Sequence, residues 1–178
     1  LAIGGFANSK ALSRNEDPKH ASIPFSADRN GFVIAEGAGM MIFESLENAL
    51  KRGAKIYAEV VGYGNSCDAH HFTAPRPDGV PASRAIKQAL DEGGYDADKD
   101  VLYINAHGTS TPLNDASETK AIKLALGDAA YKAKITSTKS LTGHMLGATG
   151  AVELIASTLS LYNGIVTPTV GLDNPDPE

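Results

Sequence analysis

Two segments of the chain concentrate side chains that could bind or activate a substrate carbonyl. The first, residues 105–115, reads Asn-Ala-His-Gly-Thr-Ser-Thr-Pro-Leu-Asn-Asp and directly follows a short apolar run. A neutral imidazole at His107 can offer an N–H to a substrate oxygen, while the hydroxyls of Thr109 and Thr111 can bind a polar linker. Open α/β sheets usually bind ligands where their strands end. We therefore expect His107 to face a substrate, with an ordinary loop histidine as the alternative.

The second segment, residues 137–150, places Lys139 and His144 five residues apart in a glycine-rich turn. The turn leads into an apolar helix expected at 148–162, whose N-terminal amides and dipole favour developing negative charge. A phosphate cradle is the alternative interpretation. The segment lacks both the G-x-x-x-x-G-K-[ST] and the G-x-G-x-x-G order, so nucleotide binding is disfavoured.

The elements that must position these segments alternate between strand and helix patterns. Strands are expected at 31–34, 40–43, 56–63, 101–104 and 135–137, and helices at 46–50, at 82–90, through 122–126 up to Gly127, and at 148–162. The last helix is apolar nearly all round and should be buried by neighbours on most sides. Together the elements predict a layered, mainly parallel α/β architecture with no internal repeat.

Asp115 and Glu118 can be interpreted without any chemistry. Asp-x-x-Glu ahead of an apolar helix is a capping box, and its N-cap residue stabilises a protein by about 0.5–2 kcal/mol. On this interpretation both carboxylates serve the start of the helix only.

Composition narrows the function classes. The chain has 178 residues, a net charge of -5 and scattered basic residues, so it shows no electrostatic footprint for nucleic acid. Its longest mainly apolar stretch, 145–162, is interrupted by glycines and a glutamate, whereas a membrane span needs about 20 mostly apolar residues. A single cysteine, Cys67, permits no internal disulfide and favours a reducing compartment.

The two histidine segments together resemble the motifs of β-ketoacyl-acyl-carrier-protein synthases, the elongating condensing enzymes of type II. The likeness covers nearly the whole chain, including 24–39, with Asp-Arg-Asn-Gly-Phe-Val-Ile-Ala-Glu-Gly-Ala-Gly, and 172–176, with Leu-Asp-Asn-Pro-Asp. It implies an α/β fold of thiolase-like αβαβα layers. Residues 1–55 would end the N-terminal half, and residues 56–178 would form a C-terminal half truncated before its last strands.

The resemblance implies a decarboxylative Claisen condensation. A cysteine takes the growing acyl chain, malonyl-carrier protein loses carbon dioxide, and the resulting enolate attacks the acyl thioester. His107 and His144 would donate hydrogen bonds at the malonyl thioester, since an enolate oxygen needs donors where its charge develops. Lys139 would hold the surroundings of the second histidine in order.

The resemblance also assigns supporting residues and partners. Thr109 and Thr111 match positions that bind the pantetheine arm, and Glu118 matches a glutamate near the lysine, while Asp115 stays open between support and helix cap. The implied partners are acyl carrier protein and its malonyl and acyl thioesters, in a homodimeric full-length enzyme. No metal and no cofactor beyond the carrier's phosphopantetheine are expected.

The chain departs from the family pattern in two places. It has no counterpart of the nucleophilic cysteine, since Cys67 lies beside an acidic residue and is expected to be structural, and it stops before the family's C-terminal gate. We therefore expect both ends to be cuts, the isolated chain to be inactive, and apolar surface to be exposed around 40–43 and on the last helix. A cytoplasmic location is expected, with mitochondria or plastids left open.

Two rival functions share these motifs. A ketosynthase of a polyketide pathway would carry both histidine segments. A chain-length-factor-like subunit would have the fold without catalysis. Retention of His107, Lys139 and His144 together favours the enzyme over the non-catalytic partner.

Overall fold

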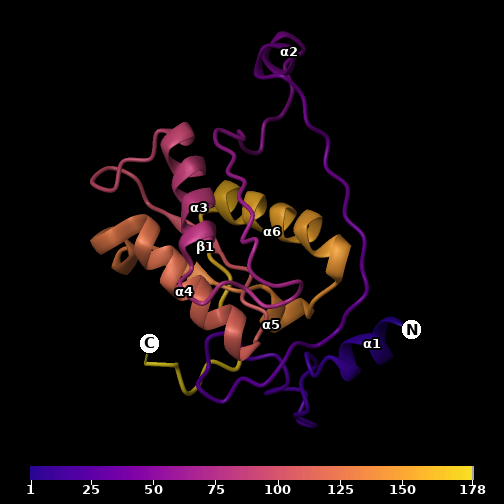
Figure 1. Cartoon of the computed structure of the whole chain (residues 1–178). Helices are drawn as coiled ribbons and strands as arrows, with labels where there is room; N and C mark the ends of the chain where they lie inside the picture. The colour runs from indigo at the N-terminus through magenta and orange to yellow at the C-terminus, as the bar shows by residue number, and fades with distance from the viewer. Residues whose placement is uncertain (178) are drawn as a thin grey trace.

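The computed structural model describes residues 1–177, built around a short parallel sheet. Strand β1 (Tyr103–Asn105) pairs with β2 (Lys134–Thr136), with Ile104 opposite Ile135. Because parallel neighbours need a crossover, the chain between them forms a helix and returns (Figure 1). The helices are α1 (Ala2–Asn8), α2 (Leu46–Lys51), α3 (Val80–Gly93), α4 (Pro112–Leu126), α5 (Lys139–Thr142) and α6 (Thr149–Asn163), with 3-10 turns η1 (Gly127–Tyr131) and η2 (Leu146–Ala148).

Helices α2, α3, α4 and α6 form where the sequence predicts helices, whereas α1 and α5 were not predicted. The ends of the predicted helices have visible causes. The hydroxyl of Ser45 caps α2 by accepting from the Asn48 N–H. Helix α3 ends at Gly94, which adopts the left-handed conformation (φ 70°) that glycine tolerates best. Helices α3 and α4 pack against each other beside the sheet (Figure 1).

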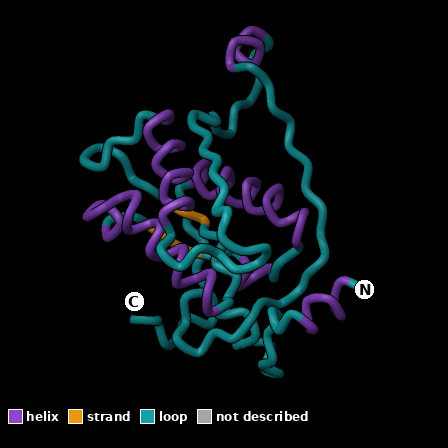
Figure 2. The backbone as a smooth tube through the Cα atoms, in the orientation of Figure 1, coloured by secondary structure: helices purple, strands orange, loops and turns teal. Residues whose placement is uncertain are grey.

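Three predicted strands are not formed. Residues 31–34 contribute only single bridges, Leu12 to Phe32 and Ile34 to His144, while 40–43 and 56–63 have no strand pairing among residues 1–177. An alternating pattern favours extended backbone, but a strand also needs a neighbour for its hydrogen bonds. Figure 2 shows these segments as loop leading to and from α2, which stands away from the body.

The predicted capping box is also wrong. Helix α4 begins at Pro112 with Thr111 as its N-cap, so Asp115 and Glu118 lie inside the helix. Proline suits the first helical position because its missing N–H would have no helical partner there. The two carboxylates are therefore available to the turn that precedes the helix.

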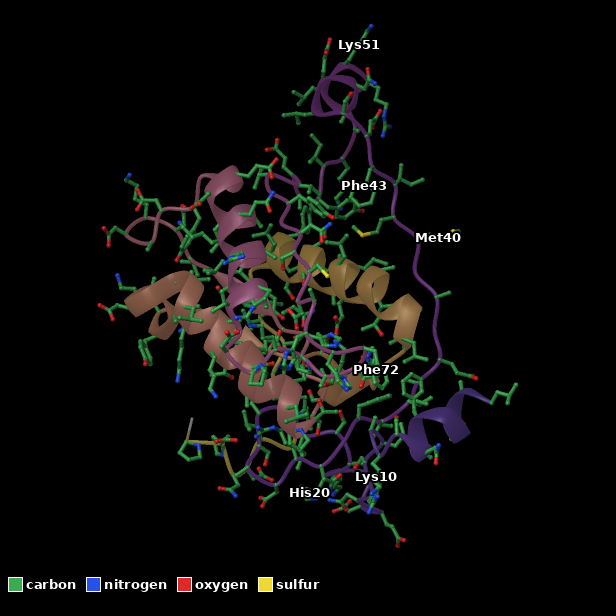
Figure 3. All side chains as sticks on the ribbon, viewed as in Figure 1. Lys10, His20, Met40, Phe43, Lys51 and Phe72 are labelled. Atoms are coloured by element: carbon green, nitrogen blue, oxygen red, sulfur yellow. The ribbon has the colours of Figure 1, made fainter. Side chains whose placement is uncertain are left out.

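The last helix is more exposed than its apolar sequence predicts. Only Thr149 and Ser160 of α6 are buried; Leu159 is 45% exposed, and Val152 and Ile155 are half-buried. The segment ending at Phe43 is also exposed (Figure 3). These exposures agree with the expectation of uncovered apolar surface.

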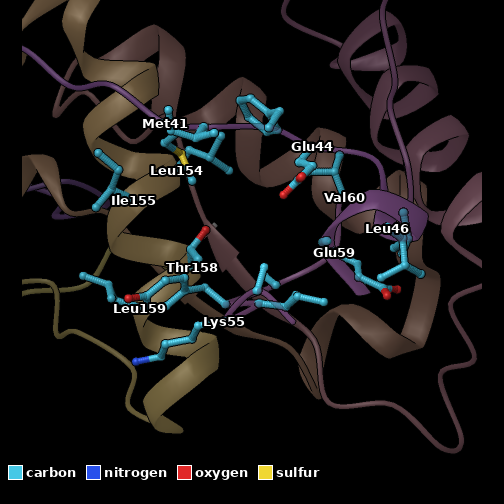
Figure 4. Close-up of a pocket in the computed structure, with 18 of the residues that line it drawn as sticks. Met41, Glu44, Leu46, Lys55, Glu59, Val60, Leu154, Ile155, Thr158 and Leu159 are labelled. Atoms are coloured by element: carbon cyan, nitrogen blue, oxygen red, sulfur yellow. The ribbon is translucent and has the colours of Figure 1, made fainter. Parts of the chain in front are cut away.

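An apolar hollow of about 680 Å³ lies between α6 and the extended chain around 41–61. Figure 4 shows Met41 and Val60 facing Leu154 and Ile155 across it. None of the predicted site residues lines this hollow. No helix in the described part of the chain is long and apolar enough to cross a membrane.

The turn at Gly143 connects the N-terminal segment to the second histidine motif. The His144 N–H donates to the Val33 carbonyl at 2.8 Å, and the Ala35 N–H donates to the His144 carbonyl at 3.0 Å. Gly143 has φ 67° and ψ -172°, and a Cβ there would lie 2.9 Å from the Ala35 Cβ and 3.0 Å from the Val33 oxygen. Only glycine fits this turn.

We expect Gly143→Ala to lower the free energy of unfolding by about 1–3 kcal/mol, the usual cost of a side chain in this backbone region. Urea denaturation measures the change. Gly150→Ala is the matched control, because that glycine is exposed in α6 and its Cβ would meet nothing within 4 Å. The control should leave stability unchanged or raise it by up to about 1 kcal/mol. Equal losses of unfolding free energy in both variants would contradict the requirement for glycine at position 143.

Candidate active site

The structure brings the two motif histidines together. His107 follows β1 and His144 follows α5, and their ring centroids lie 5.4 Å apart with the rings nearly perpendicular. Phe32, only 6% exposed, packs edge-on against His144 at a centroid distance of 5.1 Å. One small acyl group could therefore contact both imidazoles at once.

Hydrogen bonds determine which nitrogen of His144 carries its proton. The Leu146 backbone N–H donates to Nδ1 at 3.2 Å, and the Thr149 hydroxyl lies 3.0 Å from the same atom. A backbone N–H can only donate, so Nδ1 is the acceptor and the neutral ring has its proton on Nε2. His144 thus presents an N–H donor on the side away from its own turn.

A carboxylate holds the backbone of the first motif. The Glu118 oxygens accept from the N–H groups of His107 and Gly108, both at 2.7 Å. A charged acceptor makes such bonds about twice as strong as neutral ones. Burial raises the pKa of Glu118, while these two backbone donors act in the opposite direction. Glu118 therefore positions the His107 turn rather than capping α4.

Lys139 is buried but does not hydrogen-bond to either histidine. Its side chain is 1% exposed, and Nζ donates to Glu153 at 2.7 Å. The same Glu153 oxygen accepts from the Thr138 hydroxyl at 3.0 Å. Removing one partner of a buried pair typically costs about 3–5 kcal/mol, so Lys139 and Glu153 must be considered together.

Both imidazoles are held in the neutral form. Burial lowers the pKa of His107 from 6.5 to about 4, with further contributions from the charge of Lys139 and from His144, although His107 as a whole residue still has solvent-exposed surface. Burial and Lys139 likewise lower the pKa of His144. Near neutral pH the pair therefore offers N–H donors without a permanent charge.

The threonines predicted to bind a linker lie beside this pair. The hydroxyls of Thr109 and Thr111 are 2.7 Å apart and hydrogen-bond to each other. Between them, Ser110 adopts a positive φ of 65° while fully buried. Its hydroxyl accepts from the Ile23 N–H and its carbonyl accepts from the Gly31 N–H.

The turn at Gly108 leaves no space for a side chain. A Cβ there would lie 2.5 Å from the Ser137 Cβ and 3.2 Å from the Phe25 ring. Phe25 itself has a positive φ of 65°. Such backbone is costly, about 1–3 kcal/mol per residue, and tends to occur at functional sites.

Two residues of this site were not predicted from the sequence. Glu153 lies in α6 and pairs with Lys139, and Phe32 packs on His144. An acidic residue in an otherwise apolar helix was the available signal for Glu153, because a buried charge needs a partner. Phe32 belonged to a recognised motif but had been interpreted as part of a strand.

The other candidate groups lie apart from the site. Within residues 1–177, no group of three or more His, Cys, Asp or Glu could hold a metal ion. His71 accepts from the Thr73 and Ala74 N–H groups in its own loop. Cys67 is exposed, and its thiol is free, with no disulfide.

Two family models together match most of the chain. Residues 57–173 match the family model described as "Beta-ketoacyl synthase, C-terminal domain", and residues 1–49 match "Beta-ketoacyl synthase, N-terminal domain". The chain belongs to the β-ketoacyl synthase family. This confirms the resemblance drawn from the sequence and the expected α/β, thiolase-like fold.

Individual relatives are similar over the whole chain. The 3-oxoacyl-(acyl-carrier-protein) synthase 2 of Synechocystis sp. is 56% identical over 100% of this chain, and that of Staphylococcus aureus (strain COL) is 54% identical. The chain spans 43% of the length of both proteins.

Solved structures agree. A type II PKS acyl-carrier protein in complex with its ketosynthase bound to the hexaketide matches with a TM-score of 0.94 and 45% identity, covering 99% of this chain and 44% of that one. The ishigamide ketosynthase/chain length factor matches with a TM-score of 0.87 and 41% identity, covering 99% of this chain and 41% of that one.

The pKa of His107 gives a direct test of the site's electrostatics. In a pH titration followed by NMR, the ring signals of His107 should show a midpoint near 4. Lys139→Met should raise that midpoint, because it removes a positive charge that disfavours the imidazolium. The unfolded histidine has a pKa of about 6.5, so below this pH the unfolded state binds a proton that the folded state does not. The free energy of unfolding should therefore fall as the pH drops from 6.5 towards 4.

Lys55→Met is the control for this titration. Lys55 lies over the rings of Tyr57 and Tyr162, and no site residue is among its ring partners. It should leave the His107 midpoint unchanged. A midpoint near 6.5 in the unmodified protein, or no change in the Lys139 variant once its fold is verified by circular dichroism, would contradict the proposed electrostatics.

Proposed function

We propose that the full-length protein containing this chain performs a decarboxylative Claisen condensation in fatty-acid elongation. The observation that carries the proposal is the pair of neutral imidazoles, His107 and His144, at 5.4 Å. Two N–H donors in a partly buried site can stabilise a developing enolate without adding charge. The 56% identity to a 3-oxoacyl-(acyl-carrier-protein) synthase 2 supports the fatty-acid substrate class.

The proposed reaction has a simple electron balance. The bond between the malonyl α-carbon and its carboxylate breaks and releases carbon dioxide, and the electron pair forms an enolate. The enolate oxygen accepts from Nε2 of His144 and from His107. The enolate carbon then attacks an acyl thioester on an upstream cysteine, and the thiolate leaves as the β-ketoacyl thioester forms.

The surrounding residues have proposed roles that follow from their contacts. Burial lowers the pKa of both imidazoles most, and the charge of Lys139, which is paired with Glu153, helps to keep them neutral. Glu118 holds the His107 backbone. Thr109 and Thr111 bind the pantetheine arm of the carrier protein.

The proposal includes partners and a setting. The substrates are malonyl and acyl thioesters on acyl carrier protein, and the ketosynthase complex among the structural neighbours supports a carrier-protein partner. The reaction needs no metal and no cofactor other than the carrier's phosphopantetheine. We propose a homodimer in the cytoplasm, where a free exposed cysteine is compatible with a reducing environment. The boundary near residue 55 between the two halves stays a prediction.

A polyketide ketosynthase is the second candidate, because a structure with a type II PKS carrier protein matches with a TM-score of 0.94. The acyl chains that each enzyme accepts distinguish the two candidates. A fatty-acid enzyme extends a chain whose β-keto group is reduced in each cycle, whereas a polyketide enzyme accepts unreduced chains. A chain-length-factor-like subunit would turn over neither.

His144→Ala in the full-length protein tests the mechanism. Loss of one donor to a developing oxyanion typically lowers the rate about 100- to 1,000-fold. We expect carbon dioxide release from malonyl-carrier protein to fall by this factor, while the upstream cysteine still accepts an acyl group. The variant is first acylated and isolated, then mixed with malonyl-carrier protein, and carbon dioxide is followed.

His20→Ala is the matched control, because His20 pairs with Asp17 and Asp173 away from the imidazole pair. It should acylate and decarboxylate like the unmodified enzyme. Carbon dioxide release at the normal rate in the His144 variant would remove this residue from the mechanism. Failure of acylation would instead assign His144 to the cysteine's half of the reaction.

A further inference from the structure

Arg29 is a buried cation behind the active-site turn, outside the hydrogen bonds described so far. Its side chain is 7% exposed. The guanidinium donates to the Ser26 carbonyl at 2.8 Å, to the Pro112 carbonyl at 3.1 Å, and to the carboxylate of Asp176. Arg29 therefore joins three segments far apart in sequence: its own loop, the start of α4, and the C-terminal turn.

The fourth contact of Arg29 is electrostatic. Its Nε lies 3.7 Å from Asp115, within ion-pair distance, and is the one side-chain polar atom among the described residues that is buried without a hydrogen-bond partner. Since an unsatisfied buried donor costs about 1–3 kcal/mol, such an atom needs a compensating interaction. The Asp115 charge supplies it.

Asp115 in turn connects that cation to the active-site turn. Its carboxylate accepts from the Phe25 N–H at 2.9 Å, and a weaker contact with the Thr109 backbone N–H also lowers its pKa. Phe25 contacts the Gly108 position next to His107. The carboxylate must be ionised to accept both bonds fully, yet it is 1% exposed.

We propose that Arg29 is a positioning residue for the condensing site: its ion pair fixes the Asp115 carboxylate, and Asp115 then holds Phe25 and Thr109 in place beside His107. The functional part of this inference rests on the proposed function, while its structural part does not. Arg29 touches no reacting atom and acts through Asp115.

The electrostatics around Asp115 agree with this assignment. Burial raises the pKa of Asp115, and Arg29, Asn114 and the backbone donors oppose the rise. The charged groups that face it are Arg29, Glu118 on the same helix, and Asp176 through Arg29. Without Arg29 the pKa of Asp115 rises further. The two backbone bonds are then lost at a higher pH as the solution is acidified.

Glu118 makes the effect local. The charge of Asp115 raises the pKa of Glu118, so protonation of Asp115 lowers the pKa of Glu118 and leaves Glu118 ionised. The bonds from His107 and Gly108 to Glu118 should therefore survive when those from Phe25 and Thr109 weaken. A general loss of packing would loosen all four.

Hydrogen exchange in the full-length protein tests the structural part without any assay of activity. In Arg29→Met, peptides covering the Phe25 and Thr109 amides should exchange at least about tenfold faster, a change equivalent to ~1.4 kcal/mol. Peptides within α6 should be unchanged. Arg29→Lys keeps the charge without the planar fork, so it should retain most of the protection at these amides.

Kinetics test the functional part. We expect kcat/KM for malonyl-carrier protein to fall about tenfold to 100-fold in Arg29→Met, the scale of a small misplacement near a reacting group. Most of the loss should appear in KM, because Thr109 is proposed to bind the pantetheine arm. The acid limb of the pH profile should move to higher pH in Arg29→Met and stay nearly in place in Arg29→Lys.

Arg52→Met is the matched control. Arg52 is exposed and forms an ion pair with Glu44 near α2. It should change neither exchange nor kinetics at the site. Normal exchange at Phe25 and Thr109 in a folded Arg29→Met variant would overturn the proposal, as would a uniform increase that includes α6. If Arg29→Met does not fold, equal loosening in Arg29→Lys overturns it. Faster exchange at the Phe25 and Thr109 amides in a protein that has no condensing activity would contradict only the proposed function.

Discussion

The arrangement of the site depends on keeping a buried lysine charged next to two imidazoles that must stay neutral. Lys139 satisfies its own charge through Glu153, and this pair leaves the positive potential directed at both rings. Burial is the larger cause of the lowered pKa of both imidazoles, and repulsion from the Lys139 charge adds to it. The histidines thereby remain donors near neutral pH, and no hydrogen bond between lysine and histidine is needed.

A second layer of buried charges supports the backbone. Glu118 accepts the backbone N–H groups of His107 and Gly108, and Asp115, one turn earlier in α4, accepts the backbone N–H of Phe25. Arg29 balances the outer carboxylate from the opposite side. Pairing Arg29 with Asp115 and Asp176 in this way avoids an unpaired charge in the interior, which would cost far more than any single hydrogen bond contributes.

The sequence predicted the helices better than the strands. Periodicity and glycine stops located α3, α4 and α6 within a few residues, because those signals are local. The capping-box interpretation failed because Pro112 starts α4 earlier, at a position where its missing N–H costs nothing. The strands expected at 40–43 and 56–63 failed for another reason: a ladder depends on a neighbouring strand, and no local pattern reveals whether one is present. Pairing of Lys139 with Glu153 is likewise a three-dimensional fact that spacing alone did not disclose.

The backbone bridge between Ile34 and His144 has a consequence for how the molecule reaches its native state. Helices such as α3 and α4 form from contacts close in sequence, whereas this bridge closes a loop that spans most of the chain. Closing a long loop costs entropy before any contact compensates for it, so such pairings tend to come late. An early compact state can therefore contain most of the helices while His144 is still far from its partner. The paired-histidine site would then be among the last features that the folding chain acquires.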